Sequence, residues 1–160
     1  IGIIGVCLGA QLLSYAAGGD TELLKSGTPL RPNPEIGWDE IYSVDYQSED
    51  EISMILKEPI KVLHWHEDRI LLPQKAKLLA SSKNCMEQLF KIRNKAYGLQ
   101  FHVEPEANMI NDWIEYYKDF IISGLGPTGI KRLKEDENLN EKITLESRVI
   151  FIEKLLELTM

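Results

Sequence analysis

Cys7 is the residue of this chain whose neighbours most directly suggest covalent chemistry. It lies in the stretch Gly5-Val6-Cys7-Leu8-Gly9, after an apolar pair at positions 3–4 and before a run at 8–17 with helical spacing. The apolar pair predicts the end of a buried strand, and the run predicts a helix that stops at the glycines of positions 18–19. A nucleophile on a sharp turn from strand to helix forms a nucleophile elbow, here with sulfur in place of oxygen.

The two flanking glycines and the helix both bear on how Cys7 would react. A strand that reverses sharply into a helix crowds its neighbours, so we expect that a side chain at Gly5 or Gly9 would collide with nearby backbone. The N–H groups of the first helical turn and the positive end of the helix dipole favour a thiolate over a thiol. We therefore predict that Cys7 is a nucleophile rather than a small buried apolar residue.

A candidate base, His102, ends an apolar stretch within Tyr97-Gly98-Leu99-Gln100-Phe101-His102-Val103-Glu104-Pro105-Glu106. If extended geometry continues past His102, Glu104 projects from the same side of the chain and can orient the imidazole. Glu106 is a rival, but the proline before it and its own charge suit the first turn of a helix. Cys7, His102 and Glu104 are thus the predicted nucleophile, base and orienting carboxylate.

Topology would have to bring Cys7 and His102 together, because they are far apart along the chain. Both follow apolar strands, and in a parallel α/β sheet reactive groups gather outside the carboxyl ends of the strands. The alternative for His102 is a histidine at a strand end that is satisfied by a backbone carbonyl.

His64 and His66 alternate along a predicted strand, with Asp68 two residues further on. Alternate residues of a strand share a face, so this pattern raises the possibility of a metal site. One more good ligand at a suitable spacing is lacking, and Trp65 and Trp38 look like core or pocket walls. We therefore expect no metal and no organic cofactor.

Composition limits the classes of partner. The chain has 160 residues, is 44% hydrophobic, and carries 18 basic and 25 acidic residues for a formal charge of −7. Without a basic stripe it should not bind nucleic acid, and its surface should be repelled by a bare anionic membrane. It has neither a bilayer-length apolar stretch nor the pattern of a signal peptide, so we expect a cytoplasmic protein with both Cys7 and Cys85 as free thiols.

The remaining periodicity predicts further strands and helices around these residues. Strands are expected at 41–46, 61–66, 78–81 and 88–93, with a polar acidic turn at 47–51. One helix should run from about 106 to 122, and after a polar stretch at 131–141 a final helix should start near Thr144. The first of these helices has a predicted buried face formed by Ile110, Trp113, Ile114, Tyr117, Phe120 and Ile121.

The stretches around Cys7 and His102 resemble those of the class I, or triad, glutamine amidotransferases. The resemblance rests on Gly5-Val6-Cys7-Leu8-Gly9-Ala10-Gln11-Leu12-Leu13 and on the residues at 97–104, in this order. Between them, Glu35-Ile36-Gly37-Trp38 and His64-Trp65-His66-Glu67-Asp68 resemble the stand-alone branch related to the glutaminase half of GMP synthase. The fold that follows is α/β and flavodoxin-like, with a mixed, mostly parallel sheet flanked by helices.

The resemblance implies hydrolysis of the side-chain amide of glutamine through a γ-glutamyl thioester on Cys7. It further implies that the N–H of Leu8 stabilises the oxyanion and that Gln11 helps to hold the amino-acid end of glutamine. Trp65, His66 and Glu67 would form another wall of that pocket. A synthetase that receives the ammonia is a possible partner.

Two departures from the family pattern leave alternatives open. Glu67 stands where the family usually has glycine, which favours a γ-glutamyl peptidase that accepts peptides or conjugates. Family members also carry a further half-domain before the elbow, including a glycine-rich loop. We therefore expect that residues 1–160 are an N-terminally incomplete class I domain, and a catalytically silent binding or regulatory module is a further alternative.

Overall fold

The computed structural model describes residues 1–47 and 50–160. Its central element is a six-stranded sheet in the order β1-β10-β9-β8-β5-β6. These strands comprise β1 (Ile3–Val6), β5 (Glu35–Ser43), β6 (Ile60–His66), β8 (Ala76–Ser82), β9 (Leu89–Ile92) and β10 (Ala96–Leu99). Two small two-stranded sheets accompany it, one of β2 (Asp20–Leu23) with β7 (Asp68–Leu71) and one of β3 (Lys25–Ser26) with β4 (Arg31–Pro32).

The α/β class with a mixed sheet and flanking helices is as predicted, but the sheet is mostly antiparallel in this chain. Among the described strands of this sheet only β1 and β10 pair in parallel, whereas the β10–β9, β9–β8, β8–β5 and β5–β6 pairs are antiparallel. The physical reason is the connections: β8, β9 and β10 follow one another through short loops, and parallel neighbours need a long crossover instead. The strands predicted at 61–66, 78–81 and 88–93 correspond to β6, β8 and β9. The one predicted at 41–46 was wrong in its bounds, because β5 begins at Glu35 and ends at Ser43.

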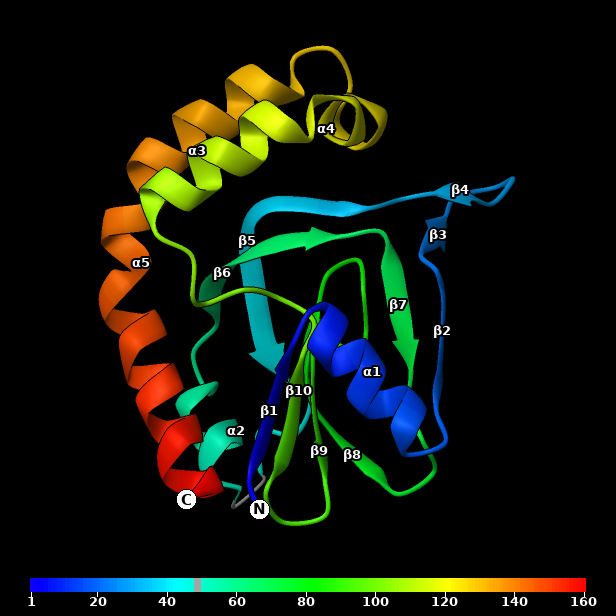
Figure 1. The fold of residues 1–160 in the computed structure, drawn as a ribbon, viewed down its shortest axis with the longest axis vertical. Coiled ribbons are helices and arrows are strands. Elements are labelled where there is room, and N and C mark those ends of the chain that lie inside the picture. Colours follow the sequence, from blue (N-terminus) through cyan, green and yellow to red (C-terminus); the bar gives the residue numbers. More distant parts are fainter. Residues whose placement is uncertain (48–49) are drawn as a thin grey trace.

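Helices cover both faces of the sheet (Figure 1). On one face, α1 (Leu8–Ala16) packs Ala10 and Leu13 against Phe90 of β9. On the other face, α2 (Glu51–Ile55) and the end of α5 (Gly129–Thr159) contribute Ile52, Phe151 and Leu155 to the largest apolar cluster. This two-sided burial explains why β9 and β10 are almost wholly apolar.

A second apolar cluster lies where β5 and β6 extend beyond the rest of the sheet. There α3 (Ala107–Tyr116), α4 (Lys118–Leu125) and the start of α5 close over the strands, with Leu63, Ile114 and Leu133 at the centre. Figure 1 shows α3 and α4 together at the end of the molecule where α5 begins. This helical cap lies beside the carboxyl ends of β1 and β6, where Cys7 and His66 share a cavity with α3.

Two helix predictions were wrong in their bounds. The helix expected from 106 to 122 is broken at Tyr117, whose backbone (φ −112°, ψ 36°) separates α3 from α4. The stretch at 131–141 is part of the 31-residue α5 rather than a loop before a helix at Thr144. Its buried residues Leu133, Glu137, Asn140 and Thr144 recur at helical spacing, so its polar composition concealed a packed face.

The acidic turn expected at 47–51 includes residues 48–49, which lie outside the described residues, and α2 starts at its last position. Asp50 caps this helix by accepting the N–H of Ile52. Within the described parts of the chain, none of the helices combines the length and the apolarity that crossing a bilayer requires.

Candidate active site

Cys7 occupies the turn between β1 and α1, in a backbone conformation that few side chains adopt. Its φ is 49° and its ψ −108°, and its N–H donates a hydrogen bond of 2.7 Å to the carbonyl of Leu99 at the end of β10. A non-glycine residue with positive φ is strained and persists only where the surrounding structure holds it. The structure therefore places the thiol on a sharp, strained turn, as the sequence predicted.

The crowding at this turn is one-sided. A Cβ atom at Gly5 would lie 2.5 Å from the carbonyl oxygen of Gly9, which explains the glycine at position 5. A Cβ atom at Gly9 would meet no described atom within 4 Å, so the prediction that Gly9 also needs to be glycine was wrong. The reason is direction: the backbone of Gly9 faces Gly5, while its own Cβ position points into open space.

His102 lies three residues beyond the end of β10, the strand that is parallel to and beside β1. An isolated antiparallel bridge to Leu63 of β6 fixes its backbone, with hydrogen bonds of 2.8 and 3.2 Å. Its Nδ1 atom lies 2.6 Å from Oε1 of Glu104, and the other oxygen of Glu104 accepts the N–H of Val103 at 2.9 Å. Glu106 is exposed and serves as the cap residue of α3, so Glu104 is the carboxylate that contacts the imidazole.

The electrostatics of this group favour a protonated imidazole. Burial lowers the pKa of His102, but its hydrogen bonds with Cys7 and Glu104 outweigh this effect and raise the pKa from 6.5 to about 9. Burial raises the pKa of Glu104, yet the contact with His102 leaves that pKa below its ordinary value. At neutral pH the arrangement can therefore hold an imidazolium between the sulfur of Cys7 and the carboxylate of Glu104.

A cavity of about 520 Å³ contains Cys7 and His102 together. The other residues that line it are Trp65, His66, Glu67, Trp113, Tyr117 and Phe120. The three predicted wall residues at 65–67 thus lie in the same cavity as the predicted nucleophile and base. Leu8 and Gln11 are not among its lining residues: Leu8 begins α1 with an exposed side chain, and Gln11 points to Gln100.

Gln100 is a site residue that sequence reasoning missed. Its Nε2 atom lies 3.7 Å from Sγ of Cys7 and can donate to it, while its Oε1 atom lies 3.4 Å from Nε2 of Gln11. The side chain is fully buried. A buried amide in an otherwise apolar strand was the available signal, because such a group needs a polar partner.

Three aromatic residues of the helical cap were also missed as parts of the site. Trp113, Tyr117 and Phe120 were expected in the core, but they surround Trp65 with ring-centroid distances of 5.5, 6.4 and 6.2 Å. Trp113 also meets the ring of His102 edge to face at 5.1 Å. Their spacing marks one helix face, and sequence alone does not distinguish a face toward the core from a face toward a cavity.

The second cysteine has a different environment. Cys85 is a free thiol that is buried, and burial raises its pKa to about 12. A thiol that stays protonated is a poor nucleophile.

His64 and His66 do lie close together, but the third group beside them is not Asp68. It is Glu35 of the neighbouring strand β5, and candidate ligand atoms of the three residues all lie within 4.8 Å of one another. Asp68 contributes only its backbone carbonyl, which accepts a hydrogen bond from Nδ1 of His66 at 2.8 Å. Pairing of β5 with β6 therefore supplies the group that the linear pattern lacked.

Comparisons with known proteins point to one family. The family model for class I glutamine amidotransferases matches residues 1–123. One subunit of the glutamine-hydrolyzing GMP synthase of Sulfolobus acidocaldarius is 34% identical over 120 residues, which cover 74% of this chain and 57% of the relative. A glutamine amidotransferase-like protein of Salmonella typhimurium, YfeJ, is 27% identical over 146 residues, 88% of this chain and 58% of that protein.

A further relative has a different activity in its name. Gamma-glutamyl peptidase 4 of Arabidopsis thaliana is 27% identical over 115 residues, 71% of this chain and 44% of that protein. The chain thus spans less than two thirds of the length of these curated relatives.

Among solved structures, a glutamine amidotransferase of Thermotoga maritima superimposes with a TM-score of 0.76 at 28% identity, over 96% of this chain and 62% of that one. The residues matched by the family model include both Cys7 and His102. The chain belongs to the class I glutamine amidotransferase family.

Proposed function

We propose that this chain hydrolyses the side-chain amide of glutamine through a γ-glutamyl thioester on Cys7. The observation that carries the proposal is the strained turn at Cys7, which shares a cavity with His102, the histidine that Glu104 contacts. Membership of a glutamine amidotransferase family supports the same chemistry. In this proposal residues 1–160 belong to one class I glutamine amidotransferase domain.

The roles follow from the charges at neutral pH. The Cys7 thiolate attacks the γ-carbonyl carbon, and the C–N bond breaks as His102 gives its proton to the departing ammonia. A water molecule then loses a proton to His102 and attacks the thioester, which releases glutamate and restores the thiolate–imidazolium pair. Glu104 holds the imidazole in place and stabilises its positive charge.

The other proposed contacts concern substrate binding. The N–H of Leu8, directly after the nucleophile, would donate to the tetrahedral oxyanion. Trp65, His66 and Glu67 would form the wall that faces the amino-acid end. Gln11 would act through Gln100, whose amide lies between Gln11 and the sulfur.

Two measurements test the proposal. Ammonia released from glutamine should appear with turnover, and a glutamine-analogue electrophile should label Cys7 far faster than Cys85. Equal labelling of the two cysteines would contradict an activated thiol at Cys7. No turnover and no labelling would favour a catalytically silent binding module instead.

A synthetase that consumes the ammonia is the partner we propose. The proposal rests on the Sulfolobus acidocaldarius relative, whose name describes one subunit of a glutamine-hydrolyzing GMP synthase. A partner of this kind should stimulate ammonia release when it is added with its own substrates.

A γ-glutamyl peptidase is a second candidate, which the walls of the cavity favour. Trp65, Trp113, Tyr117 and Phe120 offer an apolar surface that ammonia as a leaving group does not need, and a larger amine could pack there. The Arabidopsis relative carries this activity in its name. Comparing amine release from γ-glutamyl dipeptides with ammonia release from glutamine distinguishes the two, since rapid glutamine turnover without dipeptide cleavage eliminates the peptidase.

A further inference from the structure

Glu35, His64 and His66 form a buried cluster on one face of the β5–β6 pair, separate from Cys7 and His102. In the register of these strands Glu35 is opposite His66, and Gly37 is opposite His64. The three side chains therefore project from the same face, and their residues are only 5%, 1% and 4% exposed. Two imidazoles and a carboxylate buried together need partners that compensate for lost water.

The hydrogen bond of His66 to the backbone fixes which of its nitrogens carries a proton. Asp68 offers a carbonyl oxygen, which can only accept, so Nδ1 of His66 is the N–H donor. In a neutral ring Nε2 then carries a lone pair, and it lies 2.9 Å from Oε2 of Glu35 without the alignment of a hydrogen bond. The lone pairs of Nε2 and Oε2 repel each other at 2.9 Å, and a cation that binds both atoms would remove this repulsion.

His64 is the least satisfied member of the cluster. Among the described residues neither of its ring nitrogens has a hydrogen-bond partner, although Nδ1 lies 3.6 Å from the same carboxylate oxygen. Burial disfavours a charged imidazole, so the buried ring of His64 has a lone pair to offer. The neutral imidazole is the form of histidine that binds metal ions, through a nitrogen lone pair.

The carboxylate is held in position from its other side. Ser82 donates its hydroxyl to Oε1 of Glu35 at 2.6 Å, and Gln88 donates its amide to Oε2 at 2.5 Å. Hydrogen bonds of this kind orient metal ligands and are typical of the shell around a metal site.

The separations of the two histidines from the carboxylate suit a small tetrahedral ion. Bonds of the length that zinc forms with nitrogen and oxygen place neighbouring ligands about 3.3 Å apart. The two measured separations from Oε2 of Glu35, 2.9 Å to His66 and 3.6 Å to His64, lie on either side of this value. We propose that Glu35, His64 and His66 bind one divalent transition-metal ion of the zinc class, with a water as fourth ligand.

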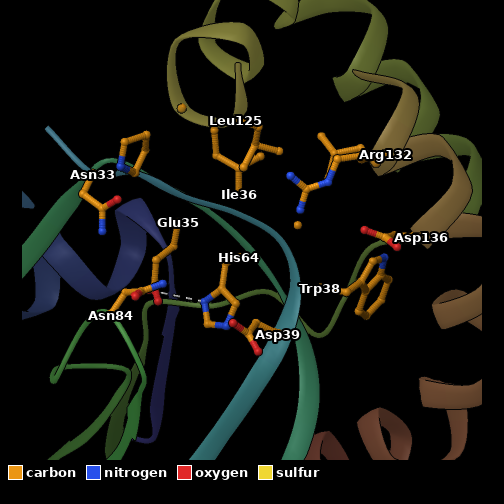
Figure 2. A pocket seen from close by; sticks show the side chains of 14 residues that line it. Asn33, Glu35, Ile36, Trp38, Asp39, His64, Asn84, Leu125, Arg132 and Asp136 are labelled. Carbon is orange, nitrogen blue, oxygen red and sulfur yellow. Dashed lines mark ion pairs between the residues drawn. The ribbon is translucent and has the colours of Figure 1, made fainter. Parts of the chain in front are cut away.

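A polar cavity gives such an ion a route to the cluster. This cavity, of about 280 Å³, reaches Glu35 and His64 at one end, and its walls include Asp39, Asp136 and Arg132 (Figure 2). The carboxylates of Glu35, Asp39 and Asp136 outnumber the one guanidinium of Arg132. The cavity therefore carries a net negative charge, which favours the entry of a cation.

The site has a structural link to the proposed active site without sharing its chemistry. His66 lines the cavity of Cys7, whereas His64 lines the polar cavity. A metal ion would lock the His66 ring, and with it one wall of the Cys7 cavity. The proposal does not depend on glutaminase activity.

Titration of the purified, chelator-treated protein with Zn²⁺ tests the site, in a Cys7→Ser background so that the Cys7 thiol cannot act as a ligand. We expect one Zn²⁺ per chain by calorimetry or competition with a zinc indicator. Glu35→Gln and His64→Gln should each weaken binding by about 100-fold or more, since each removes a ligand of a three-residue set. Asp68→Asn is the matched control, because it changes an acidic residue next to the cluster and keeps the carbonyl, and it should leave affinity unchanged.

Cobalt spectroscopy keeps the test valid if a cluster variant fails to fold. In the Cys7→Ser protein, whose cluster is intact, Co²⁺ should give the intense visible absorption of a tetrahedral nitrogen and oxygen site, and Zn²⁺ should remove it. The proposal is overturned by absence of Zn²⁺ binding to this protein, which would mean that a proton bridges Glu35 and His66. It is equally overturned by a weak octahedral Co²⁺ spectrum, or by folded Glu35→Gln and His64→Gln proteins that bind Zn²⁺ as tightly as before.

Discussion

Nδ1 of His102 lies 2.6 Å from Oε1 of Glu104, on a short extended segment that the buried Arg148 of α5 holds in place. The imidazole is thereby oriented by its neighbour two residues along the chain, and its other nitrogen is free to serve the sulfur of Cys7. This one contact links the electrostatics of the cavity to the helix that packs behind it.

Replacing Glu104 by glutamine should change the pH dependence of the reaction. The contact with Glu104 is one of the causes that raise the pKa of His102 to about 9, so its loss lowers that pKa. In the wild type the protonated ring and its contribution to stability are fully present below pH 6.5 and are lost as the pH rises through about 9. In Glu104→Gln the alkaline limb of kcat/KM should move to lower pH, with a loss of about tenfold or more.

Glu106→Gln provides the matched control for this experiment. It makes the same chemical change two residues further on, at an exposed helix cap. Its pH–rate profile should coincide with that of the wild type. A shifted profile in Glu106→Gln and an unchanged one in Glu104→Gln would reverse the assignment.

The two cysteines should respond oppositely to substitution. Cys7→Ser should lower turnover by about four orders of magnitude or more, because a serine hydroxyl is not ionised by this surrounding. Cys85→Ala should keep turnover and lower the free energy of unfolding by about 1 kcal/mol, as expected for a small cavity at a buried site. Ammonia release and urea unfolding measure the two effects, and substantial activity in Cys7→Ser would refute the proposed thioester.

Gly5 and Gly9 form a second matched pair. In Gly5→Ala the new methyl would lie 2.5 Å from the carbonyl of Gly9, so the elbow must deform. We expect a loss of about 1–3 kcal/mol in unfolding free energy, together with a loss of activity. Gly9→Ala meets open space within a helix and should be neutral or stabilising by about 0.5–1 kcal/mol. Thermal unfolding of both variants measures the two effects. Equal destabilisation would contradict the finding that only position 5 is crowded.

Arg148 should be a positioning residue for Glu104. Its Nη1 donates to the carbonyls of Val103 and Pro105 at 3.1 and 2.9 Å, on either side of Glu104. Arg148→Met leaves these buried acceptors without a donor and should lower the free energy of unfolding by about 2–3 kcal/mol. It should also shift the alkaline limb of kcat/KM as Glu104→Gln does, which loss of stability alone would not do.

Lys142→Met is the control for the Arg148 variant. It removes a charge from the exposed side of the same helix and should change stability by less than about 0.5 kcal/mol. Activity should stay at the wild-type level. An Arg148→Met protein with an unaltered pH profile would remove the positioning role.

The chelator-treated protein should lose stability in mild acid because of His64. Its pKa falls from 6.5 to about 4 on folding, so the unfolded chain binds the proton more readily. The contribution of the neutral His64 ring to the free energy of unfolding is therefore fully present above pH 6.5 and is lost as the pH falls toward 4. The total loss should be about 3 kcal/mol, because a tenfold change in proton affinity is worth about 1.4 kcal/mol.

Urea unfolding of wild type and His64→Gln across this range measures the effect. Glu35, Asp39, His66 and His102 interact with His64 and remain in both proteins, so the difference between the two curves reports His64 together with its interactions with these four groups. The difference should shrink steadily with falling pH. Parallel curves would show that the buried ring does not titrate differently in the folded protein.

The elements closest to the proposed chemistry were the most predictable. The strand, turn and helix around Cys7 follow from local signals, namely an apolar pair, a glycine at the turn and helical spacing afterwards. The contact of His102 with Glu104 follows from strand geometry over two residues. The catalytic roles of these residues stay predictions, because the geometry brings the groups together but does not itself show a reaction.

Other features depended on contacts that sequence neighbours do not reveal. The sheet was expected to be mostly parallel, but short loops between β8, β9 and β10 impose antiparallel pairs. The polar stretch at 131–141 was not predicted as helix, because only packing against β5 and β6 shows that its Leu133 and Glu137 are buried.

By itself, the sequence determined the identity of the reactive groups and their local turns, since these depend on residue type and spacing over a few positions. Tertiary structure decided which distant groups meet. It set Gln100 beside Cys7, brought the aromatic face of α3 and α4 over Trp65, and paired β5 with β6 so that Glu35 joined two histidines. The physical reason is that strand register and helix packing minimise the exposed apolar surface of the whole chain. That total depends on contacts between distant segments, so no short window of sequence determines it.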